Sequence, residues 1–198
     1  GLINLKILPI NLLRNSKKLG LFVIEEGFSK ELLERQGRKD GPIVGIEENL
    51  NQIFPMLTYD FYSENKWISN YPDIYITSRE NLELLKKSST NRQYEISNYF
   101  DIDMWAKFFA ITDVLKGYHA AVPKSVKLYY NPSNGLFEPI AFDAHIGSGY
   151  EEFIFLDFFE NNNINCGYVC EDKDWLKVFF NKKNDKFIKL YLEYLEEY

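Results

Sequence analysis

An aspartate at the end of a predicted strand is the first residue of this sequence whose position suggests chemistry. Asp143 directly follows the segment 138–142, Glu-Pro-Ile-Ala-Phe, which has the apolar character of a strand. A carboxylate there has a fixed backbone and a side chain that reaches solvent, as metal ligands often do. The small residues in 144–149 leave room for a ligand near the backbone. The pattern is compatible with a divalent-metal site for phosphoryl transfer, although such an aspartate is more often only a turn-former.

Two strands and one long helix are expected to position Asp143. Residues 126–130 and 136–142 are predicted strands, and the Asn-Pro-Ser-Asn-Gly segment between them is a strong turn signal. Residues 101–117 predict a helix with apolar side chains on more than one face, which is typical of a buried central helix. We expect the hairpin to pack beside this helix. Tyr129 and Tyr130 should point to opposite faces of their strand, one into the core and one nearer a cleft.

The rest of the chain predicts strands at the N-terminal end and helices at the C-terminal end. Strands are expected at 3–10, 19–26 and 42–47, with a turn over 11–18. Helices are expected at 29–37, capped by Ser29 and closed by Gly37, at 79–87, capped by Ser78 and followed by a loop at 88–91, at 172–181, and from 185 onward. Residues 49–77 show no clear period. This order predicts an α+β fold.

Three segments, in order, resemble the CotH kinase family of spore-coat-type atypical protein kinases. The first is 20–35, Gly-Leu-Phe-Val-Ile-Glu-Glu-Gly-Phe-Ser-Lys-Glu-Leu-Leu-Glu-Arg, with Gly-Pro-Ile at 41–43. The second is Phe-Asp-Ile-Asp at 100–103, which opens the central helix. The third runs from Gly-Tyr-His at 117–119 through Lys-Leu-Tyr-Tyr-Asn-Pro to Phe142-Asp143. The tail 172–198 is similar to the helices that follow in the family.

The resemblance implies a protein-kinase-like fold that binds ATP with Mg²⁺ or Mn²⁺ and phosphorylates Ser or Thr of a protein. It further implies a location in a spore coat, in the cell envelope, at the cell surface or outside the cell as a secreted protein. Asp143 would be the metal ligand, and Glu26 would orient a phosphate-binding lysine. The position of the family's catalytic base corresponds to His119 or a residue near it, and Asp113 lies earlier, on the central helix. Ser125 stands near a position where related sequences often have an asparagine. The family also has the ending Asp-Phe-Asp, where this chain has Ala141-Phe142-Asp143 with one acid only. Because of these departures, a catalytically inactive pseudokinase or scaffold stays open as the alternative.

Composition excludes several classes of protein. The 198 residues are 45% hydrophobic and 17% aromatic, enough to build a core, so global disorder is excluded. No apolar run approaches the roughly 20 residues of a membrane span. The net charge of −6 argues against a nucleic-acid partner. We interpret 1–198 as a single domain, and the sequence begins within a predicted strand and stops within a predicted helix, which suggests a domain incomplete at both ends.

Other readings of the polar and aromatic residues stay open. Acid pairs such as Asp101/Asp103 and Glu25/Glu26 could serve a glycosidase, but adjacent acids are mostly caps and solvated edges. The aromatic residues of 54–75 could form a partner surface in the scaffold reading. Cys166 and Cys170 could be free thiols or a disulfide, and they could complete a zinc site only if the two distant histidines converged.

Overall fold

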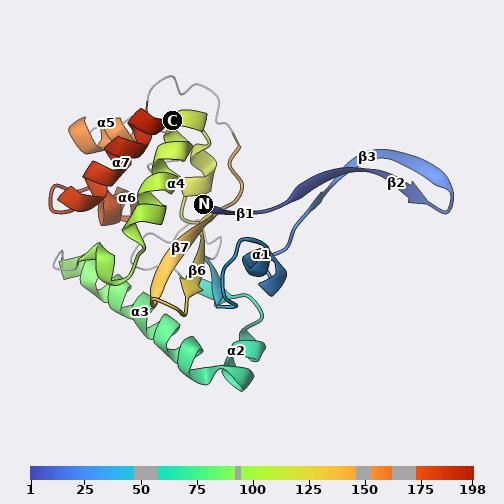
Figure 1. Ribbon diagram of the computed structural model, residues 1–198, viewed down its shortest axis with the longest axis horizontal. Coiled ribbons are helices and arrows are strands. Elements are labelled where there is room, and N and C mark those ends of the chain that lie inside the picture. The colour runs from blue at the N-terminus through green and yellow to red at the C-terminus, as the bar shows by residue number, and fades with distance from the viewer. Residues whose placement is uncertain (47–57, 92–94, 146–152, 162–172) are drawn as a thin grey trace.

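A five-stranded sheet forms the centre of the computed structural model, which describes residues 1–46, 58–91, 95–145, 153–161 and 173–198 (Figure 1). The strand order is β1-β7-β6-β4-β5, and β1 runs parallel to β7 while the other neighbours are antiparallel. These strands are β1 (Ile3–Asn4), β4 (Ile43–Ile46), β5 (Tyr59–Phe61), β6 (Lys127–Asn131) and β7 (Leu136–Ala141). With the helices described below, they confirm the α+β class.

The predicted hairpin before Asp143 is confirmed as β6 and β7. The two strands pair from Lys127 opposite Ile140 to Asn131 opposite Leu136, and Gly135 takes the left-handed backbone that closes the turn. Tyr129 and Tyr130 point to opposite faces as expected, yet both are buried. The expectation that one of them lies nearer a cleft is therefore wrong, because apolar side chains cover both faces of the sheet.

Each face of the sheet has its own apolar cluster. On one face, Leu32 and Leu33 of α1 (Lys30–Arg35) pack with Ile43 and Tyr129. On the other face, the larger cluster joins Leu128 and other strand residues to the remaining helices. Burial on both sides fixes the register of β6 and β7, since a shift of one residue would exchange their two faces.

The expected central helix is α4 (Ile102–Leu115), and helices enclose it (Figure 1). Asp101 caps its first turn by accepting a hydrogen bond from the Met104 N–H at 3.2 Å. Trp105 is fully buried and its ring stacks on Phe179 with centroids 4.8 Å apart. The surrounding helices are α5 (Ile154–Asn161), which the sequence did not predict, α6 (Lys173–Phe179) and α7 (Asp185–Glu197).

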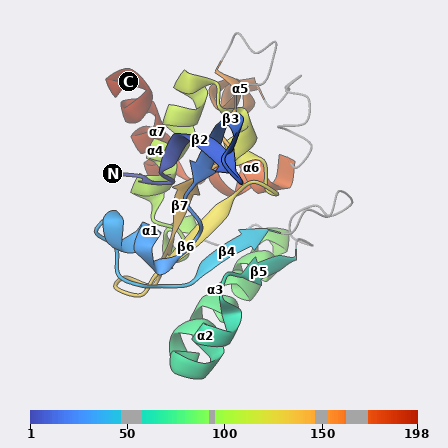
Figure 2. The ribbon, with the colours of Figure 1, turned by 90° about the vertical axis from the view of Figure 1, so that its right-hand side faces the viewer.

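The first predicted hairpin forms an arm that projects from the body (Figures 1 and 2). It consists of β2 (Ile7–Arg14) and β3 (Lys17–Glu25). These two strands pair with each other and with no other described strand. The turn is just Asn15 and Ser16, both with positive φ, so the expected turn over 11–18 is too wide. Leu21 and Val23 are 73% and 62% exposed, which leaves much of the arm's apolar surface in solvent.

The predicted helix start at Ser78 is wrong. Helix α3 (Pro72–Asn91) begins at Pro72, after α2 (Glu64–Asn70), and it continues through the expected loop 88–91. Proline favours the first position of a helix because its missing N–H has no partner there. Ser78 lies inside α3, where its buried hydroxyl donates to the Tyr75 carbonyl at 2.9 Å instead of capping.

Two shorter segments complete the described chain. They are the 3₁₀ turns η1 (Ile96–Asn98) and η2 (Tyr118–Ala121). None of the described helices combines the length and the apolar character that a bilayer crossing requires.

We predict that Gly41→Ala destabilises the fold strongly. A Cβ at this position would lie 2.4 Å from the Tyr130 carbonyl oxygen and 2.7 Å from Cε2 of Tyr129, so the strand after α1 would have to move away from β6. Such overpacking costs about 1–3 kcal/mol. Urea unfolding measures it, and the control is Gly27→Ala, whose Cβ would have no heavy atom within 4 Å. Equal stability of the two variants would contradict the packing described for residue 41.

Candidate functional site

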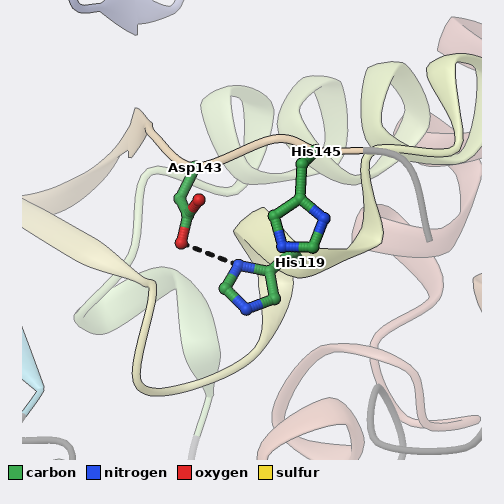
Figure 3. A group of neighbouring side chains, drawn as sticks. All are labelled: His119, Asp143 and His145. Atoms are coloured by element: carbon green, nitrogen blue, oxygen red, sulfur yellow. Dashed lines mark ion pairs between the residues drawn. The ribbon is translucent and has the colours of Figure 1, made fainter. Parts of the chain in front are cut away.

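Three residues that the sequence singled out separately meet at one end of the sheet. His119 Nδ1 lies 2.7 Å from Asp143 Oδ2 (Figure 3), and the Ser125 hydroxyl lies 3.1 Å from the same ring nitrogen. The Ser125 hydroxyl also donates to Asp143 Oδ2 at 3.3 Å. A carboxylate, an imidazole and a hydroxyl are therefore in mutual contact.

The end of α4 and the segment after it bring His119 and Ser125 to this place. Lys116, in the left-handed conformation, ends the helix, and His119 follows in η2. A turn then carries Ser125, whose N–H donates to the Val122 carbonyl at 2.8 Å. The Lys127 ammonium donates to the Ser125 carbonyl at 3.4 Å and so helps to fix the turn from the start of β6.

A short turn after β7 presents Asp143. Its φ of 55° is left-handed, which Asp and Asn tolerate better than most residues. The His145 N–H donates to the Asp143 carbonyl at 2.9 Å and closes the turn. The side chain of Asp143 is 36% exposed and that of His119 is 16% exposed, so the carboxylate lies on the solvent side of the pair.

Small residues allow the two segments to approach each other. A Cβ on Gly117 would lie 3.2 Å from Cβ of Ala144 and 3.3 Å from its carbonyl oxygen. A larger residue at either position would separate the turn that bears Asp143 from the turn that bears His119. The expected small-residue loop thus has a structural use at Ala144, whereas its later part, 146–149, lies outside the described residues.

His145 is the site residue that the sequence did not predict. Its ring stacks on that of His119, with centroids 4.0 Å apart and planes inclined by 29° (Figure 3). His119, Asp143 and His145 each offer a ligand atom, and these atoms lie within 4.8 Å of one another, so the group could hold a metal ion. No local pattern marks His145, because its neighbour His119 comes from a different part of the chain.

The contacts do not match a serine-nucleophile triad. In such a triad the serine and the carboxylate bind different nitrogens of the histidine, which takes the serine proton on one nitrogen while the carboxylate orients the ring through the other. Here Ser125 and Asp143 both lie against Nδ1 of His119. Ser125 is also 96% buried, since its exposed fraction is 4%. We therefore interpret its hydroxyl as a positioning group.

Asp113, predicted as a second catalytic candidate, has a structural position instead. It is fully buried, and its carboxylate accepts hydrogen bonds from the Phe155 N–H at 3.2 Å and from the Tyr191 hydroxyl. It thereby joins α4 to the first turn of α5 and to α7. Burial raises the pKa of Asp113 to about 6, although the bonds from Tyr191 and Phe155 oppose the rise. Asp113 is not a member of the His119–Asp143 group.

Glu26 likewise lies apart from this group, at the base of the arm. Its carboxylate accepts from Arg35 Nε at 3.1 Å and from the Lys6 N–H at 2.9 Å. The hydrogen bond from Arg35 lowers the pKa of Glu26 despite some desolvation. The partners of the Glu26 carboxylate are therefore an arginine side chain and a backbone amide. The expected pairing of Glu26 with the side chain of a phosphate-binding lysine is not seen among the described residues.

The other candidates find ordinary roles or lie outside the described residues. Asp101 caps α4, and Asp103 accepts a hydrogen bond from the Tyr194 hydroxyl at 2.7 Å. Of the aromatic residues expected to form a partner surface within 54–75, Phe61, Trp67 and Tyr75 are buried in the core, whereas Tyr71 is exposed. Phe54 and both cysteines, 166 and 170, lie outside the described residues.

Comparison with known proteins adds no family to this picture. No protein-family model matches the chain, and no curated protein matches it. The resemblance to CotH kinases therefore rests on the sequence motifs, and the function must be argued from the site itself.

We predict a pH dependence of stability that Asp113→Asn removes. The folded protein holds a proton on Asp113 up to about pH 6, whereas the unfolded chain releases it near its ordinary pKa of 3.8. Stability should therefore fall as the pH rises from 4 to 6, by up to about 3 kcal/mol from this group. Urea unfolding at pH 4 and pH 7 measures the difference.

The matched control is Asp103→Asn, which alters a second carboxylate of α4 that also accepts a tyrosine hydroxyl. It should keep the pH dependence of the parent protein between pH 4 and 7. If Asp113→Asn keeps it too, the buried carboxyl does not titrate as its surroundings imply.

Proposed function

We propose that the chain is a metal-dependent phosphotransferase of the protein-kinase-like type, which transfers the γ-phosphoryl group of ATP to a Ser or Thr hydroxyl of a protein. One observation carries the proposal: His119, Ser125 and Asp143, each assigned to this chemistry from a separate motif position, lie in contact. The α+β architecture, with a hairpin leading to the acid, is compatible with it.

Asp143 is the residue we assign to the divalent ion. Its carboxylate is the most exposed part of the His119–Asp143 pair and follows a buried strand, so an ion and its phosphate ligands could reach it without disturbing the core. An ion bound there would draw phosphate oxygens together and neutralise part of their charge. The donor set of one carboxylate and nearby imidazoles fits a divalent cation such as Mn²⁺.

His119 is the residue we assign to the proton. An imidazole can accept a proton near neutral pH, and the Asp143 carboxylate, 2.7 Å from Nδ1 of His119, fixes the orientation of the ring. In the transfer, the substrate hydroxyl oxygen forms a bond to the γ-phosphorus and the bond to the ADP oxygen breaks. The hydroxyl proton passes to the His119 ring and later to water. Ser125 positions both partners of the pair.

The setting and the substrate follow from the motif resemblance alone. It favours a protein of a coat, envelope or cell surface as the substrate. The net charge of −6 separately argues against a nucleic-acid partner. The alternative is a non-catalytic pseudokinase that retains the fold as a scaffold. The two differ in whether the His119–Asp143 pair supports transfer, which one experiment can decide.

We predict that Asp143→Asn weakens metal-dependent ATP binding at least about tenfold, because the variant loses the anionic ligand. Asparagine tolerates the left-handed backbone at 143, so the free energy of unfolding without ligand should change by less than about 1 kcal/mol. His119→Ala should keep ATP binding within a few fold but lower the rate of phosphoryl transfer about 10²-fold or more. Calorimetric titration with Mn²⁺–ATP and a radiolabelled transfer assay measure the two effects.

The control variant is Asp60→Asn, which changes an exposed aspartate of β5, the edge strand that β4 and β6 separate from β7. It should leave both binding and transfer unchanged. Metal-dependent ATP binding that is indifferent to Asp143→Asn would refute the assignment of this residue. Binding that depends on Asp143 without any transfer, in the parent protein as in His119→Ala, would establish the pseudokinase reading.

A further inference from the structure

The two histidines of this chain, distant in sequence, lie at a single place. The sequence of 198 residues contains only His119 and His145, and their rings stack beside Asp143 (Figure 3). Imidazole is the commonest nitrogen ligand of transition metals in proteins. A cluster of both histidines with a carboxylate therefore bears on which ion the site prefers.

His119 and His145 are placed differently with respect to the carboxylate. His119 is the less exposed of the two, and its Nδ1 contacts both Asp143 and Ser125. His145 is exposed and stands two residues after Asp143 on the same turn, which the bond from its N–H to the Asp143 carbonyl closes. An ion arriving from solvent would meet the exposed pair, Asp143 and His145, first.

Packing supports a fixed distance between these two side chains. The turn that carries them lies directly on the end of α4, where Ala144 fits against Gly117. The ring of His145 is further confined by the ring of His119, 4.0 Å away. Restricting both ligands before the ion binds lowers the entropic cost of binding.

We propose that Asp143 and His145 form a mixed oxygen–nitrogen seat for a divalent ion, with His119 bound to the carboxylate behind it, and that this seat prefers Mn²⁺ to Mg²⁺. Mg²⁺ takes oxygen ligands and loses water reluctantly, whereas Mn²⁺ accepts an imidazole nitrogen more readily. The inference rests on the proposed function for its relevance to phosphoryl transfer, but ion binding itself requires neither nucleotide nor substrate.

The experiment uses MnCl₂ alone with the full chain. Electron spin-echo measurements on bound Mn²⁺ detect a directly coordinated nitrogen, and competition titrations give the Mn²⁺/Mg²⁺ affinity ratio. We expect nitrogen coupling in the parent protein and a ratio of about ten or more. In His145→Asp the coupling should disappear and the ratio should fall severalfold, because an oxygen ligand replaces the nitrogen. His145 is exposed, so this variant should fold normally, which circular dichroism checks.

His119→Ala is the matched variant, since it removes the other imidazole of the same stacked pair. It should keep the nitrogen coupling. Coupling that survives His145→Asp, or that is lost only in His119→Ala, would overturn the assignment of His145. Absence of Mn²⁺ binding in the parent protein would overturn the seat as a whole. If Mn²⁺ binds with nitrogen coupling but ATP does not bind, the seat stands and the phosphotransferase proposal fails.

Discussion

Burial of most of α4 is the constraint on which the rest of the structure depends. A helix with apolar side chains on more than one face needs packing partners on each of them, and here the sheet lies along one side of α4 while α5, α6 and α7 pack against others. Trp105 and Phe109 sit among the aromatic rings of these helices. Because Asp113 also lies on this helix, its carboxylate can be buried only where the α5 backbone and Tyr191 supply hydrogen bonds.

The site is a consequence of how α4 and β7 end. Both elements are held in the core, so their ends are fixed, and the turns that follow meet through Gly117 and Ala144. Polar side chains on these turns then contact one another without any long loop. The packing of α4 and β7 in the core thus positions His119 and Asp143, although these two side chains themselves stay partly accessible to water.

Local signals predicted what local sequence determines. The turn residues at 131–135 marked the β6–β7 hairpin, and the spacing of apolar side chains from residue 101 onward marked α4. The start of α3 was missed because Ser78 imitates a cap, although its hydroxyl bonds back within the helix. Asp143 could be found from the strand that precedes it, but His145 could not, since its role depends on a contact with His119 that only the packing of α4 against β7 creates.

We propose one ion-binding site at the end of the sheet, in which Asp143 and His145 hold the ion and His119 lies directly behind the carboxylate. Nuclear magnetic resonance tests it directly, because the chain has only two histidines and each imidazole gives its own signals. Small additions of paramagnetic Mn²⁺ should broaden both sets of imidazole signals together, before the signals of residues elsewhere in the chain, and excess Zn²⁺ should reverse the broadening. Imidazole signals that stay sharp while Mn²⁺ broadens resonances at other acidic surfaces would contradict the account.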